Sequence, residues 1–208
     1  MSDIYVYTLD GKIYINLTNH CTNNCVFCIR TLKDDVEGAN LRLSSENVKV
    51  ENIISQLKTF NNVEGNEVIF CGYGEPLIKL SEVLELSKYI KENYKNVKIR
   101  VNTNGMGNLI HKKNIVPELA RNIDAVSVSL NADNEKLYDD ISQPQAAYKN
   151  SYDKVKEFIK TCAQEGLETT ATIVTGYKNF KPDVDKCEQI AKNLGARFRI
   201  REWLDNGY

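Results

Sequence analysis

Residues 13–30 read IYINLTNHCTNNCVFCIR, a short alternating run that passes directly into a loop rich in cysteine. Within the run, Ile13, Ile15 and Leu17 recur at every second position, a period that predicts a β-strand with one apolar face. The loop contributes three thiols, from Cys21, Cys25 and Cys28. A strand followed at once by such a loop is typical of α/β folds that place their chemistry at the carboxyl ends of the strands.

Similar runs recur along the chain and alternate with helical patterns. The candidate strands are Ile13–Asn19, Glu67–Cys71, Val97–Asn102, Ala125–Asn131, Thr169–Val174 and Phe198–Arg201. Apolar stripes at helical spacing lie between them, at Val50–Leu57, Leu80–Ile90, Tyr152–Cys162 and Val184–Leu194. This alternation predicts right-handed βαβ units and a parallel sheet. Six units are too few for a closed eight-stranded barrel, so we expect an α/β fold built as a partial, open (βα)6 TIM-type barrel. An N-terminal β-hairpin that turns at Asp10-Gly11 should precede it.

The strands alternate polar and apolar residues instead of being apolar throughout. In Ala125–Asn131, for example, Ser127, Ser129 and Asn131 occupy every second position. Since the helices must cover an apolar face, the polar residues are expected to point into the barrel, where they need polar partners. The alternative is an antiparallel sheet with one solvated face. The intervening helices favour the first interpretation, a polar binding cavity.

Composition excludes several classes of protein. The chain of 208 residues is 42% hydrophobic and 26% charged, with a formal net charge of −1, so we expect no general binding of nucleic acid. The N-terminus lacks a signal-peptide pattern, and no apolar stretch is long enough for a bilayer, so a cytoplasmic protein without membrane partners is expected. Six cysteines in such a compartment favour metal or redox chemistry over disulfides.

Three interpretations of the cysteine loop must be compared. A structural zinc site normally needs four ligands, and His20 directly precedes Cys21, which makes it a poor fourth ligand. A disulfide with a spare thiol is disfavoured by the compartment. Three cysteines suit a [4Fe–4S] cluster that keeps one iron open for an exogenous ligand.

The spacing Cys21-x-x-x-Cys25-x-Phe27-Cys28 resembles the CxxxCxΦC signature of the radical S-adenosylmethionine (SAM) superfamily, including the aromatic residue before the last cysteine. The resemblance implies one radical SAM core domain over residues 1–208. It implies a [4Fe–4S] cluster held by the three cysteines, whose open iron is chelated by the methionine end of SAM.

Two further motifs support the resemblance. Gly72-Tyr73-Gly74-Glu75-Pro76 resembles the family's GGEP motif, with Tyr73 in place of the first glycine, and Asn102–Gly105 resembles its TNG turn. By resemblance, the residues expected to contact SAM are Phe27, Gly72, Tyr73, Gly74, Glu75, Asn102, Thr103, Asn104, Ser129, Asn131 and Thr172. No residue is singled out as a catalytic radical relay.

The other cysteines and several arginines have weaker interpretations. Cys162 and Cys187 lie on apolar helical stripes and are expected to be structural. Cys71 adjoins the glycine-rich loop, where packing is favoured over a hydrogen-donor role. Arg199 and Arg201 either hold an anionic substrate group, or they reach the barrel rim or pair with Glu202, and Arg30 and Arg100 invite the same comment.

Within the superfamily, the hairpin, YINLTNHCTNNCVFCIR and VIFCGYGEPL are similar to the small radical SAM proteins linked to TatD-type nucleases. The implied function is reductive cleavage of SAM to a 5′-deoxyadenosyl radical, which abstracts hydrogen from an unidentified substrate. A low-potential donor such as flavodoxin or ferredoxin would be needed. The open barrel side suits a macromolecular substrate or a partner protein. The alternatives are a small activating enzyme of a glycyl radical protein, and a non-catalytic Fe–S or zinc module that binds a partner.

Overall fold

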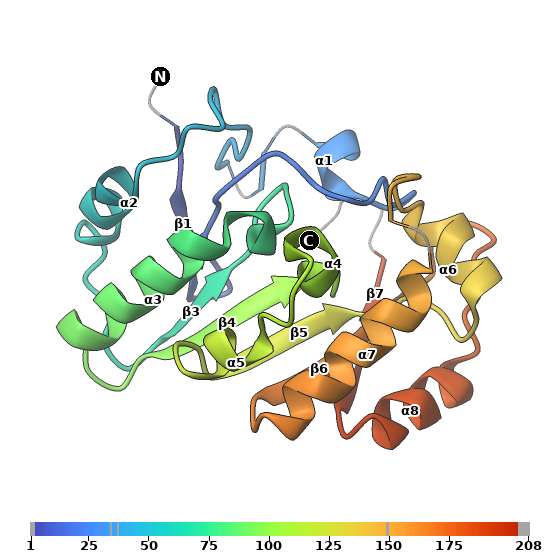
Figure 1. Ribbon diagram of the computed structural model, residues 1–208. Coiled ribbons are helices and arrows are strands. Elements are labelled where there is room, and N and C mark those ends of the chain that lie inside the picture. The colour runs from blue at the N-terminus through green and yellow to red at the C-terminus, as the bar shows by residue number, and fades with distance from the viewer. Residues whose placement is uncertain (1–2, 34, 37, 149, 204–208) are drawn as a thin grey trace.

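The computed structural model describes residues 3–33, 35–36, 38–148 and 150–203, which contain a seven-stranded sheet (Figure 1). Its strands are β1 (Val6–Leu9), β2 (Lys12–Ile15), β3 (Glu67–Phe70), β4 (Lys98–Thr103), β5 (Ala125–Ser129), β6 (Glu168–Thr175) and β7 (Arg197–Glu202). They lie across the sheet in chain order, so β1 and β7 form its two edges. β1 is antiparallel to β2, and each later pair is parallel. The expected open α/β barrel with an N-terminal hairpin is confirmed.

Helices connect the parallel strands. They are α1 (Ile29–Leu32), α2 (Val50–Leu57), the 3-10 helix η1 (Pro76–Lys79), α3 (Leu80–Asn93), α4 (Gly107–His111), α5 (Val116–Ala120), α6 (Glu135–Ser142), α7 (Ser151–Gln164) and α8 (Val184–Asn193). Figure 1 shows α3, α5, α7 and α8 next to one another over one face of the sheet. The four predicted helical stripes correspond to α2, α3, α7 and α8, which confirms them.

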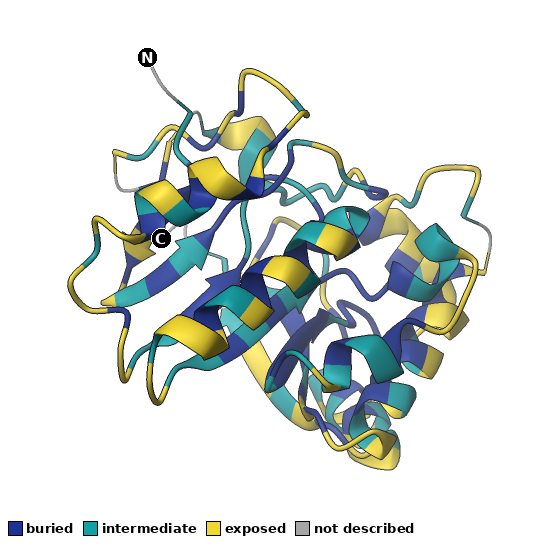
Figure 2. Ribbon diagram, turned by 60° about the vertical axis from the view of Figure 1, so that its left-hand side comes forward, coloured by how far each residue is buried: buried dark blue, intermediate teal, exposed yellow. Residues whose placement is uncertain are grey.

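The main core lies between these helices and the sheet. On β4, Ile99 and Val101 are fully buried, whereas Arg100 and Asn102 on the opposite face are only partly covered. The apolar faces of the helices supply the other side of the core, for example Val83 of α3 and Phe158 of α7. Figure 2 shows the result as helices with buried inner stripes and exposed outer stripes. The polar residues therefore line the concave face, as the alternation predicted.

Local chemistry fixes the ends of several elements. Asp10 and Gly11 both adopt positive φ, at 49° and 72°, which matches a two-residue turn between antiparallel strands. The carboxylate of Asp183 caps α8 by accepting a hydrogen bond from the Lys186 amide at 3.1 Å. After α7, Gly166 supplies the left-handed conformation that ends the helix, at φ 84°.

Two predicted strands end two or more residues earlier in the structure, and Glu67–Cys71 ends one residue earlier, at Phe70. The sheet portion of Ile13–Asn19 ends at Ile15, and beyond it Asn16 and Asn19 form side-chain hydrogen bonds to the 41–43 segment instead of to a strand. The sheet portion of Ala125–Asn131 ends at Ser129, because Asn131 takes a left-handed conformation at φ 61°. Both strands therefore end where their carboxyl ends open onto the concave face. None of the helices in the described part of the chain is long and apolar enough to cross a membrane.

Candidate functional site

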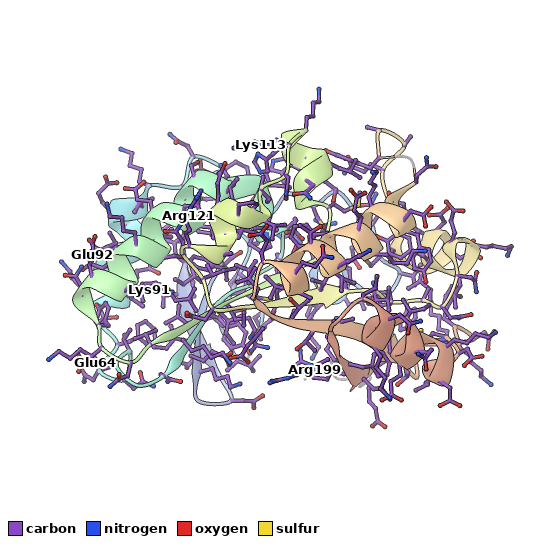
Figure 3. All side chains as sticks on the ribbon, turned by 60° about the horizontal axis from the view of Figure 1, so that its bottom comes forward. Glu64, Lys91, Glu92, Lys113, Arg121 and Arg199 are labelled. Atoms are coloured by element: carbon purple, nitrogen blue, oxygen red, sulfur yellow. The ribbon has the colours of Figure 1, made fainter. Side chains whose placement is uncertain are left out.

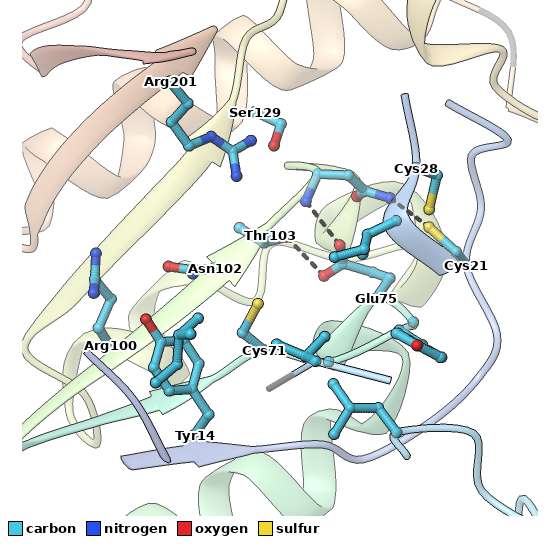
Figure 4. A pocket seen from close by; sticks show the side chains of 18 of the residues that line it. Tyr14, Cys21, Cys28, Cys71, Glu75, Arg100, Asn102, Thr103, Ser129 and Arg201 are labelled. Atoms are coloured by element: carbon cyan, nitrogen blue, oxygen red, sulfur yellow. Dashed lines mark hydrogen bonds between the residues drawn. The ribbon is translucent and has the colours of Figure 1, made fainter. Parts of the chain in front are cut away.

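A cavity of about 330 Å³ opens on the concave face, next to the cysteine loop (Figure 4). This volume lies in the range of pockets that take small organic ligands. Its wall combines the cysteine loop, the loop after β3, the end of β4 and inward residues of β1, β2, β5 and β7. The sequence-predicted residues that line it are Cys21, Cys28, Gly72, Tyr73, Gly74, Glu75, Asn102, Thr103, Asn104 and Ser129.

The three cysteines of the loop are all free thiols. Burial and the nearby Glu75 carboxylate raise the pKa of Cys21 to about 11, and burial with the two neighbouring thiols raises that of Cys25 to about 12. Figure 4 shows the sulfur atoms of Cys21 and Cys28 on one side of the cavity. Among the residues that the structure describes, no three Cys, His, Asp or Glu side chains converge in a metal-binding arrangement. The cysteines thus share one loop, not a formed ligand set.

Arg30 holds the cysteine loop from within. Its Nη1 donates to the carbonyl oxygen of Asn19 at 2.9 Å, and its Nη2 donates to that of Asn23 at 3.3 Å. These two carbonyls lie on either side of Cys21, so one guanidinium closes this part of the loop. Arg30 is thereby committed to the backbone, and neither interpretation made from the sequence, substrate contact or barrel rim, describes it.

The end of α6 supports the same loop from outside. The Val26 amide donates to the carbonyl of Ile141 at 2.9 Å, and the Asn24 amide donates to that of Gln143 at 3.1 Å. The side chain of Gln145 donates to the carbonyl of Cys21 at 2.9 Å, across 124 positions of sequence. These contacts could not be predicted from the sequence, because most of them use backbone atoms, which leave no signal in residue type.

The glycine-rich loop after β3 lies directly against the start of the cysteine loop. A Cβ atom on Gly74 would fall 2.4 Å from the carbonyl oxygens of both His20 and Thr18, so only glycine fits there. The amide of Glu75 donates to the same His20 carbonyl at 2.8 Å. A Cβ on Gly72 would meet the side chain of Asn16, a buried residue that the sequence analysis did not select.

Glu75 is buried beneath the cavity and joins two of the motifs. Its Oε1 accepts hydrogen bonds from Thr103 Oγ1 at 2.7 Å and from the Leu77 amide at 3.1 Å. Its Oε2 accepts from the Asn104 amide at 2.7 Å. Burial raises the pKa of Glu75 to about 7, although the three hydrogen bonds oppose the rise.

Asn104 completes the connection to the cysteines. Its Nδ2 donates to Thr22 Oγ1 at 2.8 Å and lies 3.7 Å from the sulfur of Cys21. Its Oδ1 accepts from the Met106 amide at 3.0 Å, which fixes the orientation of the side chain. The cysteine loop, the glycine-rich loop and the Asn102–Gly105 turn therefore meet at one hydrogen-bonded centre.

Four predicted site residues lie off the cavity wall: Cys25, Phe27, Asn131 and Thr172. Phe27 packs edge-on against Tyr177, with ring centroids 6.2 Å apart. Asn131 and Thr172 are buried side by side, since the Asn131 amide donates to the Thr172 carbonyl at 3.0 Å. The hydroxyl of Thr172 donates to the carbonyl of Val128 at 3.3 Å.

Other residues of the wall were missed or given another role. Tyr7 and Tyr14 stack at 5.2 Å between ring centroids and line the cavity from the hairpin; the alternation of Tyr14 with Ile13 and Ile15 was the available signal. Cys71, for which packing was favoured, lines the cavity instead. Cys162 and Cys187 are fully buried in the core, which confirms their structural role.

Comparison with known proteins agrees with this geometry. A model of the Radical SAM superfamily matches residues 15–191, a range that contains all three motifs. A relative is the dual-specificity RNA methyltransferase RlmN of Buchnera aphidicola subsp. Schizaphis graminum (strain Sg), 23% identical over 200 residues. The match covers 88% of this chain and 51% of the relative, so the chain spans about half the length of that protein.

Solved structures share the fold at low sequence identity. The anSMEcpe structure with bound AdoMet aligns with a TM-score of 0.65 and 18% identity, covering 92% of this chain and 51% of that one. TYW1 with a lysine-pyruvate adduct aligns with a TM-score of 0.60 and 14% identity, covering 92% and 64%. At these identities the likeness concerns the fold alone.

Proposed function

The chain belongs to the radical SAM superfamily, and on that premise we propose that Cys21, Cys25 and Cys28 hold a [4Fe–4S] cluster whose fourth iron binds SAM in the adjoining cavity. The function is reductive cleavage of SAM, followed by hydrogen abstraction from a substrate bound deeper in the same cavity. The observation that carries the proposal is the convergence of three separate motifs on one centre through Glu75 and Asn104.

The residues present fit a cluster and SAM. Three thiols free of disulfides share one loop, and two of them line the cavity. The raised pKa values of Cys21 and Cys25 mean that these thiols lose protons as metal binds, which couples loading to pH. On the wall, Asn102 keeps a buried Oδ1 with no hydrogen-bond partner in the described chain, an atom that a polar ligand would satisfy.

When bound, the cluster supplies the electron that breaks a C–S bond of SAM and yields the 5′-deoxyadenosyl radical. The chain's own part is to bind and orient. Gly72 and Gly74 bring backbone close to the ligand, and Glu75 presents a carboxylate to the methionine ammonium. Asn102, Thr103, Asn104 and Ser129 supply polar contacts from the ends of β4 and β5.

Three of the residues predicted to contact SAM do not line the cavity, and in this proposal they support the cavity wall from behind. Phe27 supplies aromatic surface near the cluster from beside the wall, and Tyr73 supplies it from the wall itself. Asn131, just after β5, and Thr172, within β6, join the two strands next to Ser129 through their backbone hydrogen bond. These roles follow from the family resemblance and from the placement of the residues around the cavity.

We further propose that residues 1–208 act as one core domain and that a low-potential carrier such as flavodoxin or ferredoxin delivers the electron, since cluster potentials reach about −700 mV. The motif likeness favours a place among the small TatD-linked radical SAM proteins. Six free cysteines suit a reducing, cytoplasmic setting. The open sheet leaves room for a macromolecular substrate or a partner protein.

The test is anaerobic reconstitution with iron and sulfide, followed by dithionite, SAM and a chromatographic assay for 5′-deoxyadenosine. Wild type should carry cluster absorption and release 5′-deoxyadenosine, and Cys25→Ala should lose both. Cys162→Ala is the matched control, because it removes a cysteine from the core and leaves the loop intact. Circular dichroism checks that each variant folds.

Either of two results would count against the proposal. Equal cluster content in Cys25→Ala and Cys162→Ala would contradict the ligand assignment. A wild-type protein that carries the cluster but neither binds nor cleaves SAM would favour a non-catalytic Fe–S module.

A further inference from the structure

Three arginines line the cavity at the end away from the cysteines. They are Arg100 on β4 and Arg199 and Arg201 on β7. Figure 4 shows Arg100 and Arg201 on the side opposite Cys21 and Cys28, with Asn102 and Cys71 between the two groups. In Figure 3, Arg199 lies well away from Lys113 and Arg121, which belong to the helical side of the molecule.

These arginines differ in their partners. Arg100 makes a two-pronged contact with Glu67, at 3.0 Å from Nε to Oε1 and 3.2 Å from Nη2 to Oε2. Lys12 contacts the same carboxylate at 2.8 Å, so Glu67 is shared between two cations. Arg199 donates from Nη2 to Ser127 Oγ, a neutral acceptor, at 3.2 Å.

Arg201 is the exception. Within the described residues it has no carboxylate at ion-pair distance, and its Nε is buried without a hydrogen-bond acceptor. The side chain is only partly exposed. A guanidinium that is partly withdrawn from water and lacks an acceptor is costly in free energy, and a bound anion removes that cost.

Among the described residues of the cavity wall, no acid forms an ion pair with Arg201 that would offset this charge. The carboxylate among the lining residues belongs to Glu75, which lies at the other end and already accepts three hydrogen bonds. Arg199 and Arg201 are two positions apart on one strand, so they leave the same face of β7 about 7 Å apart. Two guanidinium groups at that spacing can hold one oxyanion between them.

We infer that Arg201, assisted by Arg199, binds a carboxylate or phosphate group of the substrate. This inference rests on the proposed function and extends it. It assigns the substrate to an anionic class and sets the orientation of the substrate in the cavity. With its oxyanion at β7, the rest of the substrate extends past Cys71 and Asn102 toward the cysteine loop, where SAM is proposed to bind. The C–H bond that reacts is thus remote from the anionic group.

The first test measures anion binding by the full-length, cluster-free protein. Inorganic phosphate and malonate are titrated against chloride at matched ionic strength, with calorimetry and the unfolding temperature as readouts. Wild type should bind at least one of the two anions saturably, and the preferred anion distinguishes a phosphate from a carboxylate substrate. Arg201→Gln should weaken that binding by about tenfold or more, the loss of a charge-assisted pair of hydrogen bonds.

Arg197→Gln is the matched control. Arg197 lies on the same strand, is largely exposed and contacts Glu168 at 3.5 Å, but it does not line the cavity. This variant should keep anion affinity within about twofold of wild type, as expected for a surface charge. If both substitutions weakened anion binding equally, the effect would reflect general electrostatics and the inference would be overturned. An absence of saturable anion binding in the wild type would also overturn it.

A second test separates the substrate from SAM, whose own carboxylate is an anion. On reconstituted protein, the preferred anion and SAM should bind together, and Arg201→Gln should retain its iron and its affinity for SAM. Displacement of the anion by SAM would assign Arg201 to the cofactor and overturn the inference. Because the first test needs neither cluster nor SAM, failure of the proposed SAM chemistry would be seen separately from failure of the anion site.

Discussion

The carboxylate of Glu75 accepts the backbone amide of Asn104 at 2.7 Å, in a part of the chain from which water is almost wholly excluded. The glycine-rich loop and the turn after β4 are therefore fixed to each other by a side chain for which the sequence predicts only contact with SAM. Glu75 can still contact a ligand, since each carboxylate oxygen has more than one acceptor direction. Because Glu75 holds these two segments together, substitutions in and around it should change measurable stability and cluster loading.

Replacing Glu75 by alanine should destabilise the fold. The change leaves the Leu77 amide, the Thr103 hydroxyl and the Asn104 amide without their acceptor, and we expect a loss of about 3 kcal/mol in unfolding free energy. Urea denaturation measures it. The exposed Glu85→Ala on α3 is the control and should change stability by less than about 0.5 kcal/mol. Equal effects would show that the three donors find other partners.

The contribution of Glu75 to stability should decrease as pH rises. Its pKa is raised from 4.5 to about 7 in the folded protein, so the folded state holds the proton more tightly than the unfolded state. The resulting stability is fully present below about pH 4.5 and is lost as pH rises through about 7, a change of about 3 kcal/mol. The measurement is the difference in unfolding free energy between wild type and Glu75→Gln at about pH 5 and about pH 8. A difference that stays constant would mean that burial does not perturb this carboxyl.

Gly74→Ala should cost far more than an ordinary glycine substitution. The new methyl group would overlap two backbone carbonyl oxygens, which cannot rotate away as a side chain can. We expect a loss of about 3 kcal/mol and impaired cluster loading. Gly65→Ala is the control: it has open space around it and only the strain of φ 72°, about 1–2 kcal/mol. A smaller loss at position 74 than at position 65 would contradict the close approach of the two loops.

Arg30→Gln should reduce iron per chain after reconstitution while changing global stability by only about 1 kcal/mol. The structural effect should be confined to the cysteine loop, because Arg30 binds two carbonyls of that loop and lies outside the main core. Iron and sulfide analysis measures the effect, with exposed Arg121→Gln as the control. Full iron content in Arg30→Gln would show that the loop keeps its shape unaided.

Cys71→Ala and Cys28→Ala should behave differently, although both cysteines line the same cavity. Cys28 belongs to the proposed ligand set, so its loss should abolish the cluster spectrum. Cys71 lies on the substrate side of the wall, and its loss should leave iron per chain unchanged. If both variants lost the cluster, the ligand assignment would need revision.

The fold was largely predictable because it follows from periodicity. Alternation on β4 and β5 identified the strands and the polar concave face, and the apolar stripes identified α2, α3, α7 and α8. The short helices α1, α4, α5 and α6 were missed because one or two turns carry too few apolar positions for a clear stripe. α6 has the same eight residues as α2 in length, but its apolar positions are only Leu137, Tyr138 and Ile141, against Val50, Ile53, Ile54 and Leu57 in α2.

The site was predictable to the extent that motif residues carry their own chemistry. The cysteine loop, Gly72–Glu75 and Asn102–Asn104 meet as expected from their places after the strands. The support from Ile141–Gln145 was not predictable, since backbone carbonyls are common to all residues. The partners of Arg30 and Arg100 were equally hidden, because residue type does not reveal which of several acceptors an arginine will reach.

The contacts between the cysteine loop and the end of α6 also bear on when the site can form during synthesis. The cysteines emerge from the ribosome well before Ile141–Gln145, since Gln145 follows Cys21 by 124 positions. Until then the Val26 amide and the Cys21 carbonyl lack their partners, and the thiols belong to an unsupported segment. The nascent chain therefore presents loosely held thiols to the cell well before it presents a finished site, and delivery of iron and sulfide belongs late in its maturation.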